Sequence, residues 1–248
     1  MTMIRAVLFD LWGTLIVDDP ASGAARERLR IEATRAVLAD AGFDYAADDI
    51  RAGFMAAGVE LGGLHEQERD LSARGRTITY LRQVDADLPD RLDDAAWRRL
   101  DEAILTPALT HGPEVMPGAA DALAAVHGLG LAIGMISNTG ITPGYVLREV
   151  LAGFGLLRYL DLTVFSDEVE MSKPAPAIFE HALGEMGLEA GEAAFVGDQP
   201  RLDVFGSRRA GLWCVQIGDL EGEDAQPHAR IAALHELVPA LRALGLVG

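Results

Sequence analysis

The sequence predicts an α/β fold in which a doubly wound parallel sheet carries an inserted, all-helical cap. Two observations predict this fold. Apolar runs of strand length recur at wide spacing and alternate with helical stretches, as in parallel sheets covered by helices on both faces. One long interval after the first run contains only helical patterns. Residues 1–16 and 112–248 are therefore assigned to the α/β core, and residues 17–111 to the cap.

The expected strands are almost continuous in apolar residues, which indicates burial on both faces of a sheet. They begin at Ala6, Leu131, Leu162, Ala193 and Trp213. Core helices are expected over residues 118–130, 176–188 and 203–212, and the acidic segment 219–229 before the last helix is expected to be a flexible loop. Ligands bind at the carboxyl ends of the strands in folds of this kind.

Four further helices are expected in the inserted interval, where Ala, Leu, Arg and Glu are abundant. They cover residues 24–42, 48–63, 66–84 and 93–105. Such a bundle is well placed to form a lid over the strand ends. Its arginine-rich runs, at residues 74–76 and 98–99, are interpreted as solvated helix faces, with contact between one cap arginine and an anionic substrate as the alternative.

The overall charge limits the possible partners. The formal net charge is -17, which argues against nucleic acid, because phosphate backbones are bound by clusters of Lys and Arg. No stretch approaches the roughly 20 apolar residues that span a bilayer, and the single cysteine, Cys214, allows no intrachain disulfide. We therefore expect a cytoplasmic protein that binds neither nucleic acid nor membrane; its oligomeric state is left open.

Four short stretches at strand ends carry the candidate chemistry. They are "FDLWGT" with Asp10, "ISNTG" with Ser137 and Asn138, "SKPAP" with Lys173, and "VGDQPRLD" with Asp198 and Asp203. Their order and context resemble the haloacid dehalogenase superfamily, most of whose members are phosphatases. The resemblance covers nearly the whole chain and implies a Rossmann-like core with a helical cap. It also implies that Asp10 is a nucleophile.

The residue chemistry agrees with that resemblance. A carboxylate can attack a phosphoryl group to form an acyl phosphate, but two negative partners repel each other, so cations are needed. Mg²⁺ prefers carboxylate and water oxygens. We expect Asp10 and Asp198 to bind it, with Asp203 direct or through water. The resemblance adds the backbone carbonyl of Trp12 as a ligand, and implies a small phosphorylated substrate.

Further groups are expected to bind the phosphoryl oxygens. Lys173 is the single lysine in a chain with 21 basic residues, and its compact charge could hold both Asp10 and a phosphate. Ser137 and Asn138 offer a hydroxyl and an amide, and backbone N–H groups of the Gly13–Thr14 turn add donors without charge.

Trp12 departs from the phosphatase pattern. Family phosphatases carry a second aspartate there, which protonates the leaving group and activates water. The dehalogenases of the family carry an aromatic residue in a similar "DLYGT" stretch, but they need no metal and lack the Gly-Asp pair that this chain has at Gly197–Asp198. A Mg²⁺-dependent phosphatase is therefore favoured. A 2-haloacid dehalogenase and a degenerate binding protein remain the alternatives.

Overall fold

The structure is a computed structural model that describes residues 3–222 and 226–248. A six-stranded sheet with the order β5-β4-β1-β6-β7-β8 forms the core, and every neighbouring pair is parallel. The strands are β1 (Ala6–Phe9), β4 (Ala132–Ser137), β5 (Leu162–Phe165), β6 (Ala193–Gly197), β7 (Trp213–Ile217) and β8 (Ala229–Ile231). The predicted doubly wound parallel sheet is confirmed.

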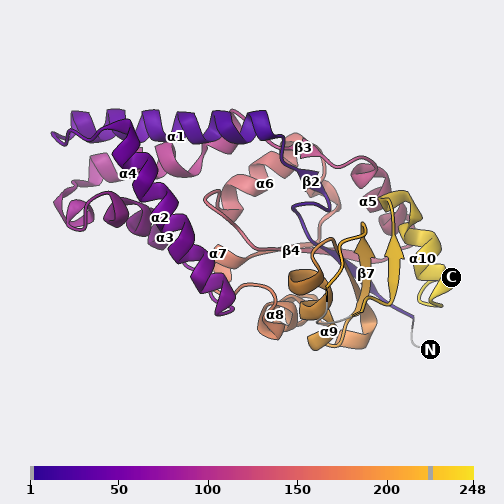
Figure 1. The fold of residues 1–248 in the computed structure, drawn as a ribbon. Helices are drawn as coiled ribbons and strands as arrows, with labels where there is room; N and C mark the ends of the chain where they lie inside the picture. The colour runs from indigo at the N-terminus through magenta and orange to yellow at the C-terminus, as the bar shows by residue number, and fades with distance from the viewer. Residues whose placement is uncertain (1–2, 223–225) are drawn as a thin grey trace.

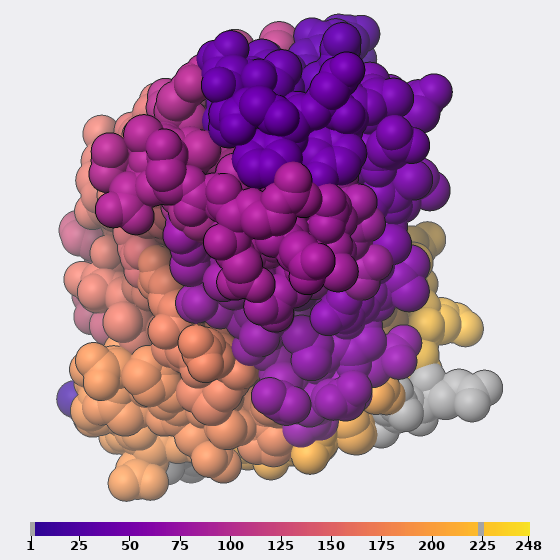
Figure 2. All heavy atoms as spheres, turned by 90° about the vertical axis from the view of Figure 1, so that its left-hand side faces the viewer, coloured from indigo at the N-terminus to yellow at the C-terminus, as the bar shows by residue number. Residues whose placement is uncertain are grey.

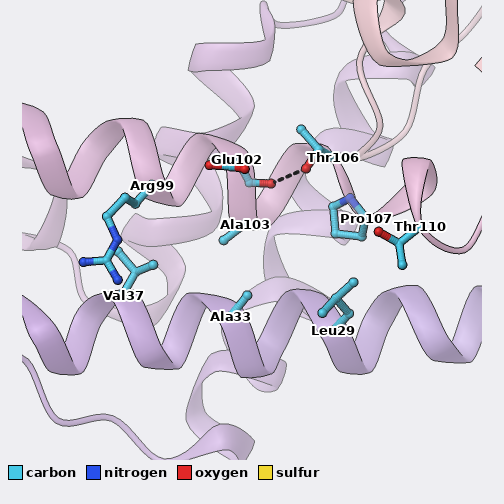
Figure 3. A pocket seen from close by; sticks show the side chains of 9 residues that line it. All are labelled: Leu29, Ala33, Val37, Arg99, Glu102, Ala103, Thr106, Pro107 and Thr110. Atoms are coloured by element: carbon cyan, nitrogen blue, oxygen red, sulfur yellow. Dashed lines mark hydrogen bonds between the residues drawn. The ribbon is translucent and has the colours of Figure 1, made fainter. Parts of the chain in front are cut away.

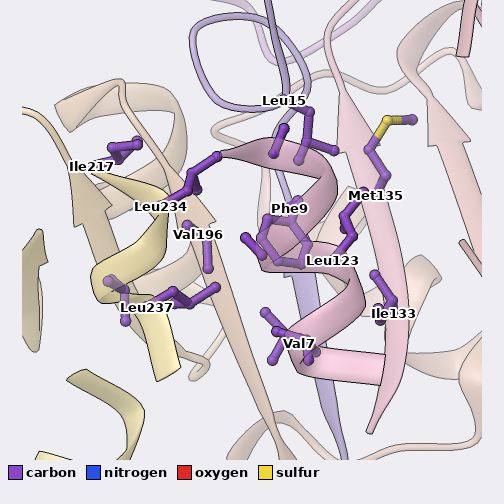
Figure 4. Close-up of a cluster of buried hydrophobic side chains, with 14 of the residues drawn as sticks. Val7, Phe9, Leu15, Leu123, Ile133, Met135, Val196, Ile217, Leu234 and Leu237 are labelled. Carbon is purple, nitrogen blue, oxygen red and sulfur yellow. The ribbon is translucent and has the colours of Figure 1, made fainter. Parts of the chain in front are cut away.

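Alternating residues of the central strand pack on opposite faces of the sheet. Val7 and Phe9 of β1 belong to an apolar cluster that also contains Leu123 and Leu237 (Figure 4). Ala6 and Leu8 point into a second cluster on the other face. Because both faces are covered, β1 is buried along its whole length, which explains its uninterrupted apolar sequence.

The core helices cover these two clusters. They are α5 (Ala119–Gly128), α6 (Gly144–Gly153), α7 (Ser166–Val169), α8 (Pro176–Met186), α9 (Gly206–Arg209) and α10 (Leu237–Ala243). Helices α5, α6 and α10 pack on the first face and α8 on the second. The predicted helix over 203–212 is displaced: a π-helical turn over Pro200–Phe205 precedes α9.

Strand β8 was missed by the sequence analysis, because three residues at the edge of a sheet form no apolar run. It begins at Ala229, the last residue of the segment that was expected to be a flexible loop. Residues 223–225, in the middle of that segment, lie outside the described residues. The described residues on either side, 219–222 and 226–228, contain neither helix nor strand.

The inserted helices leave the core through β2 (Ile16–Val17) and return through its antiparallel partner β3 (Glu114–Val115). They are α1 (Pro20–Asp40), α2 (Ala47–Glu66), α3 (Ala73–Val84) and α4 (Asp94–Leu105). They extend to one side of the sheet (Figure 1) and have an apolar cluster of their own. No helix of the described residues is both long and apolar enough to cross a bilayer.

The start of the third helix of the insertion differs from the prediction. The helix expected over residues 66–84 begins only at Ala73, where Ser72 caps it by accepting a hydrogen bond from the Gly75 N–H. The preceding loop instead reaches the core: the Asp70 N–H donates to the Glu170 carbonyl at 3.2 Å. Figure 2, viewed from the side of the insertion, shows these helices directly against the core.

A groove of about 280 Å³ runs between α1 and α4 (Figure 3). Leu29, Ala33 and Val37 line it on the α1 side. None of the residues predicted to carry chemistry lines this groove, so the candidate site has to be sought at the strand ends.

Candidate active site at the strand ends

Three adjacent parallel strands end at the candidate site. Asp10 follows the last residue of β1, Ser137 is the last residue of β4, and Asp198 follows the last residue of β6. The Asp10 N–H donates to the Val196 carbonyl at 2.8 Å, which continues the ladder between β1 and β6. The sheet therefore brings Asp10 together with residues that lie more than one hundred positions away in the sequence.

Lys173 lies at the centre of this cluster. Its Nζ atom is 2.5 Å from Asp10 Oδ1 and 2.7 Å from Asp203 Oδ1, and all three side chains are buried. Such a buried cation is stabilised by two charge-assisted hydrogen bonds. Lys173 is the single lysine of the chain, so no other lysine can take its place between the two carboxylates.

The backbone of Lys173 is held by Asn138. The Asn138 Nδ2 donates to the Lys173 carbonyl at 2.9 Å, and the Lys173 N–H donates to Asn138 Oδ1 at 2.8 Å. The Lys173–Pro174 peptide is cis. One N–H of the Asn138 amide is therefore left for a ligand, so the expected donation to a phosphoryl group is reduced to a single bond.

Three carboxylates form a candidate metal site. Oxygen atoms of Asp10, Asp198 and Asp203 lie within 4.8 Å of one another. Asp198 Oδ1 is buried and has no hydrogen-bond partner among the described residues. An unpartnered buried carboxylate oxygen beside two other carboxylates is costly, and a divalent cation with oxygen ligands would remove that cost. The residues present therefore fit Mg²⁺.

Two glycines allow these carboxylates to come close to the backbone. At Gly13, whose φ is +80°, a Cβ atom would lie 2.6 Å from Asp198 Oδ2. At Gly197 a Cβ atom would collide with the carboxylate of Asp203. Any larger residue at either position would displace an acidic side chain of the site.

Burial and mutual repulsion change the ionisation of the cluster. Burial, with repulsion from Asp203 and Asp198, raises the pKa of Asp10 to about 7 despite the opposing charge of Lys173. Burial and the charge of Asp203 also raise the pKa of Asp198. Burial alone lowers the pKa of Lys173, but the carboxylates outweigh it and raise that pKa above its usual value. The site therefore favours additional positive charge.

The turn after Asp10 differs from the expectation. The Gly13 N–H donates to the Ile16 carbonyl at 2.8 Å, and the Thr14 N–H lies 3.4 Å from the Leu11 carbonyl. These N–H groups close the turn and are not free for a phosphoryl group, which corrects the sequence prediction. The hydroxyl of Thr14 is different, because Oγ1 is buried and has no partner among the described residues.

The remaining predicted residues lie around the cluster. Ser137 is fully buried, and its hydroxyl donates to the Asn138 carbonyl at 3.1 Å. Trp12 is half-buried and packs against the core cluster, and it also lines a cavity of about 390 Å³ beside the insertion. No carboxylate occupies the position two residues after Asp10, as the sequence states.

Two residues of this cavity were missed by the sequence analysis. Arg26 and Arg30 of α1 line it together with Trp12. Both are buried. A signal was present in the sequence: residues 26, 30, 34 and 38 recur at a spacing of four, so the arginines share the helix face of buried Thr34 and Leu38.

The interpretation of the run at residues 74–76 as solvated is wrong at Arg76, which is buried and paired with Asp70.

Comparison with known proteins agrees with this geometry. Residues 4–211 match the family of haloacid dehalogenase-like hydrolases. The chain is 30% identical over 243 residues to a phosphoglycolate phosphatase of Yersinia pseudotuberculosis, covering 96% of this chain and 93% of the relative. It is 30% identical over 232 residues to a glyceraldehyde 3-phosphate phosphatase of Methanopyrus kandleri, covering 91% and 88%.

The fold also has close structural counterparts. A 2-haloacid dehalogenase from Pseudomonas syringae superposes with a TM-score of 0.70 at 23% identity, covering 98% of this chain and all of that one. At that identity the likeness concerns the fold. With the family match over most of the chain and full-length relatives at 30% identity, the conclusion is direct: this chain belongs to the haloacid dehalogenase-like hydrolases and is a hydrolase.

Proposed function

We propose that this hydrolase is a Mg²⁺-dependent phosphatase that acts on a small phosphorylated metabolite, with Asp10 as the nucleophile. The observation that carries the proposal is the buried Asp10 carboxylate, which is fixed by Lys173 beside the unpartnered oxygen of Asp198. The phosphatases among the relatives support the choice of a phosphate ester as substrate. The inserted helices α1–α4 are proposed to act as a separate cap domain over the site.

In the first step an oxygen of Asp10 forms a bond to phosphorus, and the bond from phosphorus to the leaving oxygen breaks. The leaving oxygen departs as a stabilised anion or takes a proton that the substrate itself carries, and an aspartyl phosphate remains. In the second step a water oxygen bonds to that phosphorus while the bond from phosphorus to the Asp10 oxygen breaks. A water proton goes to a phosphate oxygen, and the Asp10 carboxylate and inorganic phosphate are released. Lys173 stabilises the charge on the phosphoryl oxygens, and the Ser137 hydroxyl can turn from the Asn138 carbonyl to donate to one of them.

Asp10 and Asp198, with the Trp12 carbonyl, would hold Mg²⁺. Asp203 already accepts hydrogen bonds at both oxygens, from Lys173 at 2.7 Å and from the Gln199 N–H at 2.9 Å. We therefore place Asp203 beside the metal, reached through water. When bound, Mg²⁺ would neutralise negative charge between the carboxylates and the phosphoryl group.

Trp12 stands where family phosphatases carry the aspartate that protonates the leaving oxygen, and a tryptophan cannot protonate it. General acid catalysis contributes roughly 10²–10⁴ in rate, so we propose a substrate with a good leaving group or one that supplies its own proton. The same tryptophan favours one second candidate, a 2-haloacid dehalogenase in which Asp10 attacks carbon and displaces halide. Against it stands the cluster of three carboxylates, since an acidic substrate would be repelled by Asp198 unless a cation were bound.

The test is hydrolysis of an activated aryl phosphate and of a 2-haloacid, each with Mg²⁺ and with a chelator, by the wild type and by Asp10→Asn. We expect phosphate release that requires both Mg²⁺ and Asp10. Halide release that is indifferent to the chelator would overturn the proposal and establish the second candidate.

A further inference from the structure

Arg30 is buried, with about 6% of it exposed, and has no ion-pair partner among the described residues. Its Nε donates to the Ile104 carbonyl at 2.7 Å, and its Nη2 is buried with no hydrogen-bond partner in the described chain. Buried charges in proteins are normally paired, because an isolated charge is costly in a low-dielectric interior.

The surroundings of Arg30 offset that cost only in part. Burial lowers the pKa of Arg30 to about 10, and the positive charge of neighbouring Arg26 acts in the same direction, although Tyr80 and Glu27 oppose the shift. Arg26 itself is neutralised, because its Nη2 lies 2.5 Å from Asp18 and its Nη1 donates to the His111 carbonyl at 2.9 Å. Glu27, the acid that acts on Arg30, forms its ion pair with Arg51 at 3.4 Å. In a chain with a net charge of -17, this buried cation therefore has no ion-pair partner among the described residues.

The cavity that Arg30 lines reaches the candidate active site. Its volume is about 390 Å³, and its lining includes Trp12, two residues from Asp10, and Asn138, which holds Lys173. Arg30 also lines a second cavity of about 280 Å³ with Tyr80 and Phe54. Arg30 therefore lies between the strand-end site and the interior of the insertion, at a place that the remainder of a small substrate could occupy.

We propose that Arg30 binds a carboxylate of the substrate, so that the preferred substrates are small phosphate monoesters that also carry a carboxylate. This inference rests on the proposed phosphatase function and narrows it. With Nε bonded to Ile104, the outer Nη1 and Nη2 atoms present the flat end of the guanidinium, which matches a carboxylate. A second phosphate dianion would require two cations, but Arg26 is already neutralised.

The experiment compares phosphoglycolate with 2-hydroxyethyl phosphate, which replaces the carboxylate by a hydroxymethyl group. Wild type, Arg30→Met and Arg30→Lys are assayed with Mg²⁺. The matched control is Arg35→Met, an exposed arginine on the same helix. We expect Arg30→Met to lower kcat/KM for the acid relative to the neutral ester by about 10- to 100-fold, the loss typical of a hydrogen bond to a charged group. Arg30→Lys should recover part of the loss, and Arg35→Met should show none.

Equal losses on both esters would overturn the inference and leave Arg30 a structural residue. Faster turnover of a bisphosphate than of the acid, dependent on Arg30, would also overturn the carboxylate assignment. Calorimetric binding of phosphoglycolate to Asp10→Asn, with and without Arg30→Met, tests recognition without turnover. If Asp10-dependent hydrolysis of an aryl phosphate persists while the acid gains nothing from Arg30, this inference alone fails. If no ester is hydrolysed by the wild type, the proposed function fails first.

Discussion

Two buried cations, Lys173 at the strand ends and Arg30 in the helical insertion, differ in how they are neutralised. Lys173 at the strand ends has two carboxylate partners, at 2.5 and 2.7 Å. Arg30 in the helical insertion has none among the described residues. In the proposed site, the reactive half is the cluster around Lys173, which is assembled before substrate arrives. The recognition half is Arg30, whose positive charge would be neutralised by the carboxylate that the substrate brings.

A third buried cation shows that the insertion can neutralise an arginine. Arg76 of α3 forms an ion pair with Asp70, and Asp70 also accepts a hydrogen bond from the Leu71 N–H at 2.7 Å and contacts His65 at 3.0 Å. Burial raises the pKa of Asp70, but the hydrogen bond from His65 and the charge of Arg76 hold it below its usual 3.8. The absence of such an acid at Arg30 is therefore a particular feature of that position.

The strongest test of the reactive half is Asp10→Asn. The amide cannot act as the nucleophile, so kcat should fall by at least about 10⁴-fold on every substrate, acidic or neutral. Steady-state phosphate release measures this, with thermal unfolding to confirm the fold. A loss confined to acidic substrates would place Asp10 in recognition and would erase the distinction between the two halves.

Lys173→Met removes the paired cation. It leaves Asp10 and Asp203 buried together, so we expect a loss of about 3–5 kcal/mol in the free energy of unfolding when metal is chelated. The rate should fall by roughly 10²–10³ because the charge on the phosphoryl oxygens is no longer stabilised. Urea unfolding and kcat are the measurements. Unchanged stability would mean that this ion pair is not formed in solution.

The contrast between these regions also explains what the sequence could predict. Asp10, Ser137 and Asp198 each follow a continuous apolar run, so their convergence follows from the parallel sheet alone. The pairing of Asn138 with the Lys173 peptide depends on the local path of a loop, which no periodicity encodes. Arg30 was not singled out in the sequence, where only its spacing of four from Thr34 and Leu38 indicates a buried position.

Arg76→Met provides the matched comparison for Arg30→Met. Removing Arg76 leaves the buried Asp70 without its arginine, although His65 and the Leu71 N–H remain as partners, and should cost about 3–5 kcal/mol at pH 7. Arg30→Met leaves no buried acid without its arginine and should cost about 1 kcal/mol or less. Asp70 has a lowered pKa in the folded protein, so its contribution is present above pH 4 and is lost as the pH falls below that value. The penalty of Arg76→Met should therefore shrink in acid. Urea unfolding at pH 7 and below pH 4 measures this penalty. Equal penalties for Arg76→Met and Arg30→Met at pH 7 would contradict the comparison.

The smallest effect concerns metal binding at the reactive half. Mg²⁺ at 100 times its Kd should add about 2.7 kcal/mol to the free energy of unfolding, which raises Tm by roughly 5–10 °C in a chain of this size. Asp198→Asn should abolish most of that increase. Without metal, the same variant should be at least as stable as the wild type, because it removes a buried, unpartnered carboxylate oxygen that is repelled by Asp203. The order of the two Tm values should thus reverse when Mg²⁺ is added.

Asp121→Asn, at an acid of α5 outside the carboxylate cluster, is the control and should shift with Mg²⁺ as the wild type does. If Asp198→Asn were instead less stable than the wild type to the same degree with and without metal, Asp198 would be a structural residue and not a ligand of the metal.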